Sequence, residues 1–324
     1  MNEIKTKKNK DSIDKLKIKI KPITFSKLKE NGYTISSLSR ASPAEISNKL
    51  GVGMGYAKEI IDIAQESSGF FQQADEIYDE YINKIKLSTG SSNLDSILNG
   101  GVETGAITEF FGKSATGKTQ LLHQFCVTVQ LPIERGGLGT GVIYLDCEGT
   151  FHPDRIIEIA PQFPEVGVEV KKLLHRIEWV RIWNFDSMCI FLDKIVRKIK
   201  NEQIKLLVID SITRHFNFSK LSSREIKEIR EKFKNFFREL KNLADSENVA
   251  IVITNQMEDT NDSLDPIQAI GGVIVQHGST DRIKLRRFSG NKHGRIARIV
   301  TSPHLPEAEA VFYITQEGIV DKID

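Results

Sequence analysis

The sequence predicts an α/β protein whose mainly parallel sheet is flanked by helices and preceded by a small all-helical domain. From about residue 86, short runs rich in β-branched residues alternate with helical stretches, which is typical of βαβ units. Residues 22–67 show only helical spacing, with glycine and Ser-Pro between the segments. A glycine-rich loop at residues 112–119 joins a predicted strand to a predicted helix, as phosphate-binding loops do.

The composition is that of an ordinary globular protein. Its 324 residues are 40% hydrophobic and 27% charged. No apolar run reaches about eighteen residues and the start of the chain is polar and lysine-rich, so we expect no membrane partner and no secretory signal. The protein is therefore expected to stay inside the cell. Cys126, Cys147 and Cys189 lie far apart in apolar surroundings, which favours reduced core cysteines.

Positive charge is concentrated at the N-terminus. Residues 1–21 carry eight lysines against three acids, so the net charge of +2 leaves about −3 on the rest of the chain. Any binding of nucleic acid must then come from local basic patches. We expect residues 1–21 to form a basic, disordered tail, and both contact with nucleic acid and plain solvation remain open for it.

The helical domain, residues 22–67, contains a glycine turn that resembles a helix-hairpin-helix element. In "LGVGMGYAKEII", Gly51 and Gly53 flank Val52 and precede a helix with an apolar face. Such a turn lets backbone N–H groups approach a DNA phosphate. A plain helical turn with a glycine C-cap explains the same residues, so contact with DNA is left open. Residues 68–85 link this domain to the next.

The larger domain, residues 86–324, contains two kinds of sheet pattern. We interpret "AITEFFG", "GVIYLDC", "IEWVRIW", "IKLLVIDSI" and "VAIVITNQ" as strands, and helical stretches lie between them. This alternation predicts a mainly parallel sheet covered on both faces. The later runs "DRIKLRR", "RIARIVTS" and "EAVFYITQEGIVD" alternate at period two without helices, which predicts an antiparallel extension.

A nucleotide site is predicted at the glycine-rich loop. Gly112 and Gly117 are followed by Lys118 and Thr119, which satisfies G-x-x-x-x-G-K-[ST]. Glycines let the backbone N–H groups face phosphates, the lysine reaches the β and γ phosphates, and the threonine hydroxyl binds Mg²⁺. We therefore expect ATP and Mg²⁺ as cofactors. The residues expected to bind the nucleotide here are Gly112, Lys113, Ser114, Ala115, Thr116, Gly117, Lys118 and Thr119.

Two acidic residues are expected to complete this site. Asp210 ends the buried run "LLVID", so it should lie at the carboxyl edge of the sheet and support the metal together with Thr119. Glu148 follows the end of another strand in "YLDCEGTF" and is expected to activate water. Asp146 is the competing candidate for that role. Glu148 is favoured because it falls in the loop, where active-site residues collect.

Several longer strings resemble the archaeal RadA recombinases of the RecA superfamily. They include "LSTGSSNLDSILNGGVETGAITEFFGKSATGKTQL", "LPIERGGLGTGVIYLDCEGTFHPDRI", "VIDSITRHF" and "SPHLPEAEAVFYIT". The resemblance runs from about residue 25 to the end. It implies a RecA-type P-loop ATPase core that forms filaments on single-stranded DNA, pairs it with homologous double-stranded DNA and exchanges strands. It also implies a cytoplasmic, nucleoid-associated location.

The resemblance assigns further residues to roles. It implies that Arg155 stacks on adenine, as suits a planar guanidinium. Gln256 would sense the γ phosphate and couple it to the DNA-facing loop that follows, which makes Lys118, Glu148 and Gln256 the catalytic group. His277 and Pro306 would lie at the interface between subunits.

The linker carries an oligomerisation element in this resemblance. Phe71-Gln-Gln-Ala74 matches F-x-x-A, in which a linker strand pairs with a neighbour's sheet edge while the side chains of Phe71 and Ala74 fill pockets. A head-to-tail contact of this kind is heterologous, so the homo-oligomer would be an open filament unless rotation closes a ring.

The two DNA-facing loops differ from the family pattern. Residues 211–241 hold nine basic side chains against four acidic ones, so phosphate contacts are expected there. The second loop, "MEDTNDSLDPIQAIGG", carries four acids and no base, so only its backbone N–H groups at the end could bind phosphate. The residues expected to bind DNA are Arg214, Lys220, Arg224, Arg230, Gly271 and Gly272. Ion pairing within a solvated helix explains the later charges.

Two further departures leave an alternative function open. Thr301 stands where the family has an aspartate that helps to hold a monovalent cation, and the helical domain lacks the family's first Gly-x-Gly turn. A divergent recombinase and an accessory paralogue that binds ATP and DNA with little strand exchange of its own both remain possible. A hexameric helicase fits the phosphate loop but neither F-x-x-A nor "SPHLPEAEA".

Overall fold

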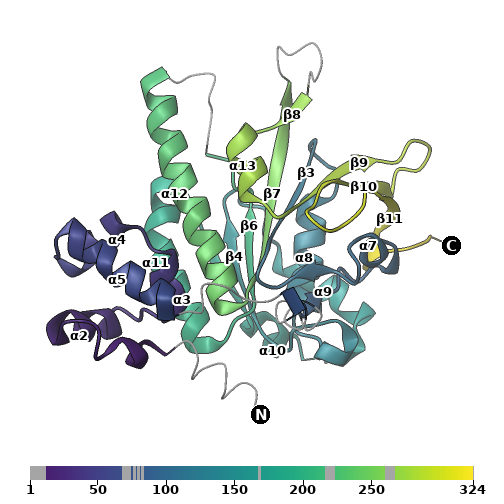
Figure 1. The fold of residues 1–324 in the computed structure, drawn as a ribbon. Coiled ribbons are helices and arrows are strands. Elements are labelled where there is room, and N and C mark those ends of the chain that lie inside the picture. Colours follow the sequence, from purple (N-terminus) through teal and green to yellow (C-terminus); the bar gives the residue numbers. More distant parts are fainter. Residues whose placement is uncertain are drawn as a thin grey trace. The chain divides into compact units, whose positions relative to one another are not determined.

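The chain divides between residues 83 and 84 into two compact units. The computed structural model describes residues 12–67, 74–75, 78, 81, 84–166, 169–215, 223–259 and 267–323. Figure 1 shows a helical first unit and a second unit built around a large sheet. Nowhere in the described residues is a helix both long enough and apolar enough to cross a membrane.

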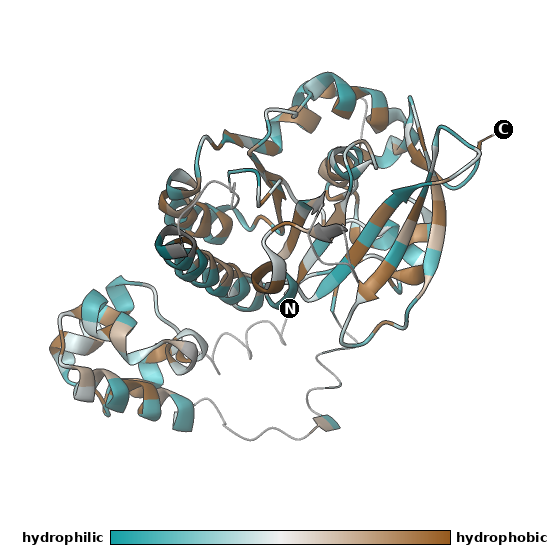
Figure 2. Cartoon of the chain, turned by 90° about the horizontal axis from the view of Figure 1, so that it is seen from above, coloured by the Kyte–Doolittle hydropathy of each residue, from teal (hydrophilic) through white to brown (hydrophobic). Residues whose placement is uncertain are grey.

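The first unit is all-helical, as predicted. Thr34 and Ser42 accept hydrogen bonds from the first turns of the helices that follow them, and Gly51 ends a helix in the left-handed conformation at φ 67°. Figure 2 shows apolar and polar residues mixed along these helices, as in amphipathic helices. Its elements are a 3-10 helix η1 (Ile13–Leu16) and helices α2 (Pro22–Glu30), α3 (Ile35–Arg40), α4 (Pro43–Leu50) and α5 (Met54–Ser67).

This unit begins earlier in the chain than predicted. Ile13, Leu16 and Ile20 are buried in the same apolar cluster as Leu28 and Ile60. The expected disordered tail, residues 1–21, is therefore wrong from residue 12 onward, because three apolar residues between the lysines supply a buried face. Residues 51–53 do join α4 to α5 in a short turn, and contact of that turn with DNA stays a prediction.

The second unit contains a ten-stranded sheet with the strand order β12-β11-β10-β9-β3-β7-β6-β4-β5, in which β8 pairs with β7. Its centre is parallel, and the strands from β9 to β12 pair antiparallel, so both sheet predictions are confirmed. The strands are β3 (Ile107–Gly112), β4 (Val142–Asp146), β5 (Ile177–Arg181), β6 (Leu206–Asp210), β7 (Ala250–Asp259), β8 (Ile267–Ala269), β9 (Asp281–Arg287), β10 (Gly294–Thr301), β11 (Glu309–Thr315) and β12 (Gly318–Val320). A separate pair joins β1 (Lys86–Leu87) to β2 (Val102–Glu103).

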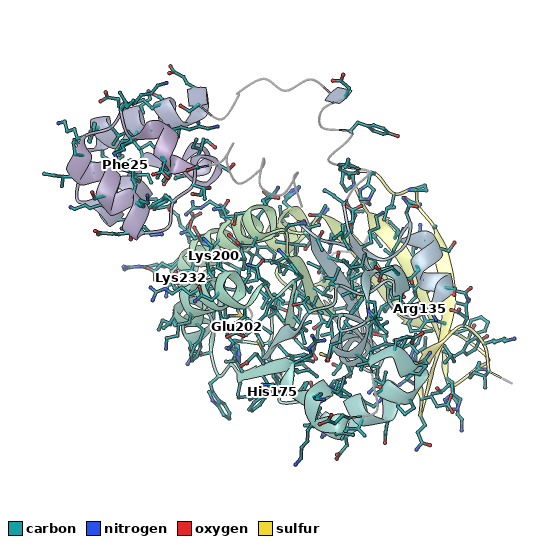
Figure 3. The ribbon with its side chains drawn as sticks, turned by 90° about the horizontal axis from the view of Figure 1, so that it is seen from below. Phe25, Arg135, His175, Lys200, Glu202 and Lys232 are labelled. Atoms are coloured by element: carbon teal, nitrogen blue, oxygen red, sulfur yellow. The ribbon has the colours of Figure 1, made fainter. Side chains whose placement is uncertain are left out.

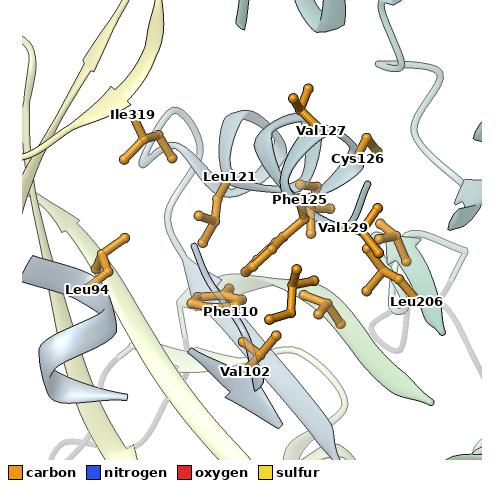
Figure 4. Packing of buried hydrophobic residues seen from close by; sticks show 14 of the residues in the cluster. Leu94, Val102, Phe110, Leu121, Phe125, Cys126, Val127, Val129, Leu206 and Ile319 are labelled. Atoms are coloured by element: carbon orange, nitrogen blue, oxygen red, sulfur yellow. The ribbon is translucent and has the colours of Figure 1, made fainter. Parts of the chain in front are cut away.

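Helices cover both faces of this sheet. On one face Phe110 packs against Leu121 and Phe125, with the two phenylalanine ring centres 6.1 Å apart (Figure 4). On the other face Ile107 belongs to the cluster formed with α11 and α12. The helices are α7 (Ser92–Ile97), α8 (Lys118–Thr128), α9 (Pro153–Ile159), α10 (Val170–His175), α11 (Phe185–Glu202), α12 (Ser223–Glu247) and α13 (Gly272–Gly278), with short 3-10 turns at Ile133–Arg135, Ala160–Gln162 and Pro164–Val166.

The parallel register aligns the predicted site residues at one edge of the sheet. Gly112 at the end of β3 is paired with Gln256 of β7, and Asp146 at the end of β4 is paired with Asp210 of β6. The carboxyl ends of neighbouring parallel strands meet at one edge, where ligands bind in open α/β sheets. Residues that are up to 144 positions apart in the chain therefore lie at one place.

The second loop is partly a hairpin. β7 continues past the sheet to Asp259, and β8 returns antiparallel to it, with Met257 opposite Ala269 and Asp259 opposite Ile267 (Figure 1). The sequence predicts only a loop from Met257, and the structure adds strand pairing between its two arms. Alternating paired residues on the two arms satisfy the backbone groups that a loop would leave to water.

Candidate nucleotide site and the adjacent loops

The phosphate loop has the conformation that its sequence predicts. Gly117 caps α8 at φ 100°, and a Cβ atom there would lie 2.5 Å from Ile314 Cδ1, so only glycine fits. The Nζ of Lys118 donates to the carbonyls of Gly112, at 2.8 Å, and of Lys113, at 3.0 Å. Burial lowers the pKa of Lys118, although the nearby carboxylates of Asp210 and Glu148 oppose this effect.

Thr119 and Asp210 meet beneath this loop. The Thr119 hydroxyl donates to Asp210 Oδ2 at 2.8 Å, and the hydroxyl of Tyr144 donates to the same oxygen at 3.0 Å. Asp210 is 1% exposed, and burial raises the pKa of its carboxyl group. A hydroxyl and a carboxylate side by side are the hard oxygen ligands that suit Mg²⁺.

The protein alone does not form a complete metal cage at this place. No group of three or more His, Cys, Asp or Glu residues that could hold a metal occurs in the part of the chain that the structure describes. In nucleotide sites Mg²⁺ keeps several waters and binds substrate phosphates with only one or two protein carboxylates. Thr119 and Asp210 are thus compatible with a metal held jointly with a nucleotide.

Glu148 and Gln256 are brought together from β4 and β7. Gln256 Nε2 donates to Glu148 Oε1 at 2.6 Å, and the hydroxyl of Ser211 donates to the same oxygen at 2.7 Å. Ser211 directly follows Asp210, so these hydrogen bonds place Asp210, Glu148 and Gln256 of β7 close together. The glutamate is half-buried and its second oxygen makes no hydrogen bond to any described residue.

Asp146, the competing candidate, has a different environment. Its Oδ1 accepts from the backbone N–H groups of Gly149, at 2.6 Å, and Thr150, at 3.2 Å, and it is paired with Arg181 at 3.2 Å. Trp179 donates to its other oxygen at 3.3 Å. These donors hold the carboxylate of Asp146 in place, and through it they fix the loop that carries Glu148.

Arg155 is anchored next to the phosphate-loop helix. Its Nε donates to Gln120 Oε1 at 2.7 Å, and its Nη2 donates to the Thr315 carbonyl at 2.7 Å. It also binds the Gln316 carbonyl and pairs with Glu158 at 2.8 Å. These bonds hold the side chain of Arg155, which is 13% exposed, and its stacking on adenine stays a prediction.

Asn255 joins the two loops that are predicted to face DNA and is the residue that sequence analysis missed. Its Nδ2 donates to Glu109 Oε1 and to the Ile270 carbonyl, both at 2.8 Å, and its Oδ1 accepts from Thr213 at 2.6 Å. Thr213 lies at the start of the first loop and Ile270 at the end of the second. The asparagine is fully buried. A polar residue in a buried run beside Gln256 was the only available signal in the sequence.

The expected DNA-binding and interface residues are largely exposed. Arg214, His277, Pro306 and Arg230 are exposed, and the Arg224 side chain is 90% exposed, with Glu228 as its ion-pair partner at 3.1 Å. Gly271, at φ 84°, leads into Gly272 at the start of α13, and a Cβ on it would lie 3.3 Å from Thr213 Cγ2. Ala74 is exposed, whereas Phe71 and Lys220 lie outside the described residues.

Basic residues later in α12 form ion pairs with acidic residues of the protein itself, as expected. Lys232 pairs with Asp186 of α11 at 2.9 Å, and Lys234 pairs with Glu231 at 3.0 Å. Lys200 of α11, labelled with Lys232 in Figure 3, pairs with Glu247 at 3.4 Å. Exposed pairs of this kind contribute little to stability, but they orient these lysines toward neighbouring acids.

Removal of the Asp210 charge is expected to stabilise the protein without nucleotide. An acid whose pKa is raised on folding keeps its proton more tightly when folded, so stability falls as pH rises from 3.8 through the raised value. Asp210→Asn should therefore raise the melting temperature at neutral pH, and the gain should vanish in acid. Asp186→Asn, at an exposed acid, is the control. A lower melting temperature for Asp210→Asn would show that its hydrogen bonds outweigh the cost of burial.

The fold and this site together define a RecA-type P-loop domain. Residues 81–322 match the family model described as Rad51, and the chain belongs to this family. It is 42% identical over 305 residues to the DNA repair and recombination protein RadA of Aeropyrum pernix. The aligned part covers 93% of this chain and 94% of that protein. It is 39% identical over 312 residues to the protein of the same name from Ignicoccus hospitalis, with 94% of each chain covered.

Proposed function

We propose that this protein is an ATP-dependent DNA recombinase that assembles on single-stranded DNA and exchanges it with a homologous duplex. The names of its relatives support a role in DNA repair and recombination. The observation that carries the proposal is the hydrogen bond from Gln256 to Glu148, because Gln256 lies on the strand that continues into the second DNA-facing loop. Such a protein acts where the chromosome is, so a cytoplasmic, nucleoid-associated location follows.

ATP and Mg²⁺ fit the residues of the site. The backbone N–H groups of the loop from Gly112 to Thr119 and the start of α8 would hold the phosphates, and Arg155 would cover the base. Lys118 already points back over the loop, so it can exchange its carbonyl partners for phosphate oxygens. Bound Mg²⁺ would supply charge stabilisation of the phosphates.

Hydrolysis would depend on Glu148. Its Oε1 is fixed by Ser211 and Gln256, so its second oxygen is left to orient a water and accept its proton. Gln256 donates to the glutamate in this state. A γ phosphate that competes for the same amide would shift Gln256, and the shift would pass along β7 into the hairpin.

DNA contact would come mainly from the first loop. Arg214 follows the end of β6 by four residues, and Arg224 opens α12 on the other side of the loop. The hairpin arms are acidic, so the second loop would contribute backbone N–H groups at Gly271 and Gly272 rather than charge. Asn255 would keep the two loops in register, because it bonds to both.

Salt titrations are expected to identify the phosphate contacts. Arg224→Ala should lower the slope of log affinity against log salt for single-stranded DNA by roughly 0.7, the value for one lost contact. The control is Arg238→Ala, which removes an exposed arginine of the same helix about 21 Å further along. Equal slopes for wild type and both variants would remove Arg224 from the DNA interface.

Assembly would use the open edge of the sheet. β5 is the last strand on its side, and its outer edge pairs with no strand in the described parts of the chain. An extended segment carrying Phe71 and Ala74 from a neighbouring copy could add to this edge by strand pairing. His277 and Pro306 are exposed, as residues at an interface between copies must be in the isolated chain.

The proposal is tested by ATP hydrolysis with and without single-stranded DNA. We expect hydrolysis to require Mg²⁺ and to rise when DNA is added. The accessory-paralogue alternative is favoured by the acids on the hairpin arms, Glu258 and Asp259, because they oppose phosphate binding. That alternative predicts ATP binding with little hydrolysis and no stimulation by DNA.

A further inference from the structure

Two arginines of the antiparallel extension lie directly opposite each other on neighbouring strands. Arg287 near the end of β9 is paired in register with Arg295 near the start of β10. Like charges in this position repel, so the pair is destabilising unless an anion compensates it. The other arginines of these strands are compensated by the protein, since Arg282 pairs with Glu109, Arg286 with Glu309 at 3.0 Å and Arg298 with Glu307 at 3.0 Å.

The Arg287–Arg295 pair has no such partner. Neither arginine forms an ion pair with a carboxylate in the described residues. Arg295 Nη1 donates only to backbone carbonyls of the hairpin, Lys292 at 2.9 Å and Gly294 at 2.8 Å. Its Nε is buried and makes no hydrogen bond to any described atom. Burial and the charge of Arg287 lower the pKa of Arg295, so this guanidinium is short of negative charge.

The pair lies beside the phosphate loop. A Cβ atom built on Gly117 would be 3.8 Å from Cγ of Arg295, so the stem of this arginine lies against the glycine that caps α8. A Cβ atom on Gly112 would be 2.3 Å from the Leu285 carbonyl, two residues before Arg287. β9 and β10 thus run along the loop that is built to face phosphates.

We propose that Arg295, supported by Arg287, binds the phosphates of the nucleotide held by this loop. The inference rests on the proposed nucleotide binding and adds two basic residues that neither the loop motif nor the metal-side acid predicts. A polyphosphate supplies both things that the pair lacks, negative charge and acceptors for guanidinium N–H groups. A nucleotide is favoured over a DNA phosphate because the Arg295 stem contacts the loop itself.

The test measures the affinity of full-length protein for ADP and for a non-hydrolysable ATP analogue, with Mg²⁺. Arg295→Gln and Arg287→Gln should each weaken binding, by about tenfold or more for Arg295→Gln. Arg286→Gln, next to Arg287 but paired with Glu309, is the matched control and should keep wild-type affinity. Without nucleotide, the Arg287→Gln variant should melt at the same temperature as wild type or a higher one, because the repulsion between the two arginines is relieved. Its melting temperature should then rise less than that of wild type when nucleotide is added.

The outcomes separate the two proposals. If wild type itself binds no nucleotide, the proposed function fails. If wild type binds and both Gln variants bind equally well, the assignment of this pair is overturned. Unchanged nucleotide affinity with weakened, salt-dependent binding of single-stranded DNA would assign the pair to DNA phosphates and also overturn it. Because Arg287 is exposed, its variant provides the test even where Arg295→Gln fails to fold.

Discussion

Glu148→Gln is expected to reduce DNA-stimulated ATP hydrolysis by about 100- to 10,000-fold while ATP still binds. The substitution keeps the shape of the side chain and its acceptor oxygen, so Ser211 can still donate to it. The same oxygen can still accept from Gln256, while an NH₂ group that cannot take a proton from water replaces the second carboxylate oxygen. Single-turnover hydrolysis and equilibrium binding of ATP, measured on the same preparation, separate the two effects.

Asp146→Asn is the matched comparison for this prediction. Because Asp146 holds the loop through backbone N–H groups and Arg181, its variant should lower the melting temperature. Glu148→Gln should leave the melting temperature nearly unchanged. If Asp146→Asn abolished hydrolysis at an unchanged melting temperature and Glu148→Gln retained it, the assignment of the base would be reversed.

Lys118→Ala is expected to weaken ATP binding by about 10- to 150-fold, which corresponds to about 1.5–3 kcal/mol for hydrogen bonds to a charged group. The lysine is 8% exposed and its ammonium group is already placed over the loop, so little ordering is needed when phosphates arrive. Fluorescence titration with a labelled nucleotide measures the loss.

The control for this variant is another lysine with a buried stem. Lys205 lies just before β6, at the opposite edge of the sheet, and burial lowers the pKa of this lysine as well. Lys205→Ala should change stability but not nucleotide affinity. Wild-type affinity in Lys118→Ala would mean that the loop does not hold phosphates through this side chain.

The centre of the fold could be predicted because its signals are local. The runs that became β3, β4 and β6 are short, mostly apolar and end in glycine or aspartate, and the phosphate loop is a contiguous string. Parallel pairing then places Gly112, Asp210 and Gln256 at one edge without further information.

The remaining features depend on contacts between distant residues. In the sequence, Asn255 is one polar residue in a predicted strand. Only the structure shows that it forms hydrogen bonds with Thr213, Glu109 and Ile270. The hairpin arms were missed because acidic residues have low strand propensity, although pairing overrides that preference. The helical unit starts earlier than the sequence predicts, because Ile13, Leu16 and Ile20 are spaced among lysines and do not form a clear apolar pattern.

The most direct test of the proposed function is DNA strand exchange by the wild-type protein with ATP, Mg²⁺, a single-stranded oligonucleotide and a homologous labelled duplex. We predict that the labelled strand is displaced from the homologous duplex and not from a heterologous one, and that omission of ATP prevents the reaction. ATP and DNA binding without any displaced strand would contradict the recombinase function and leave the accessory role in its place.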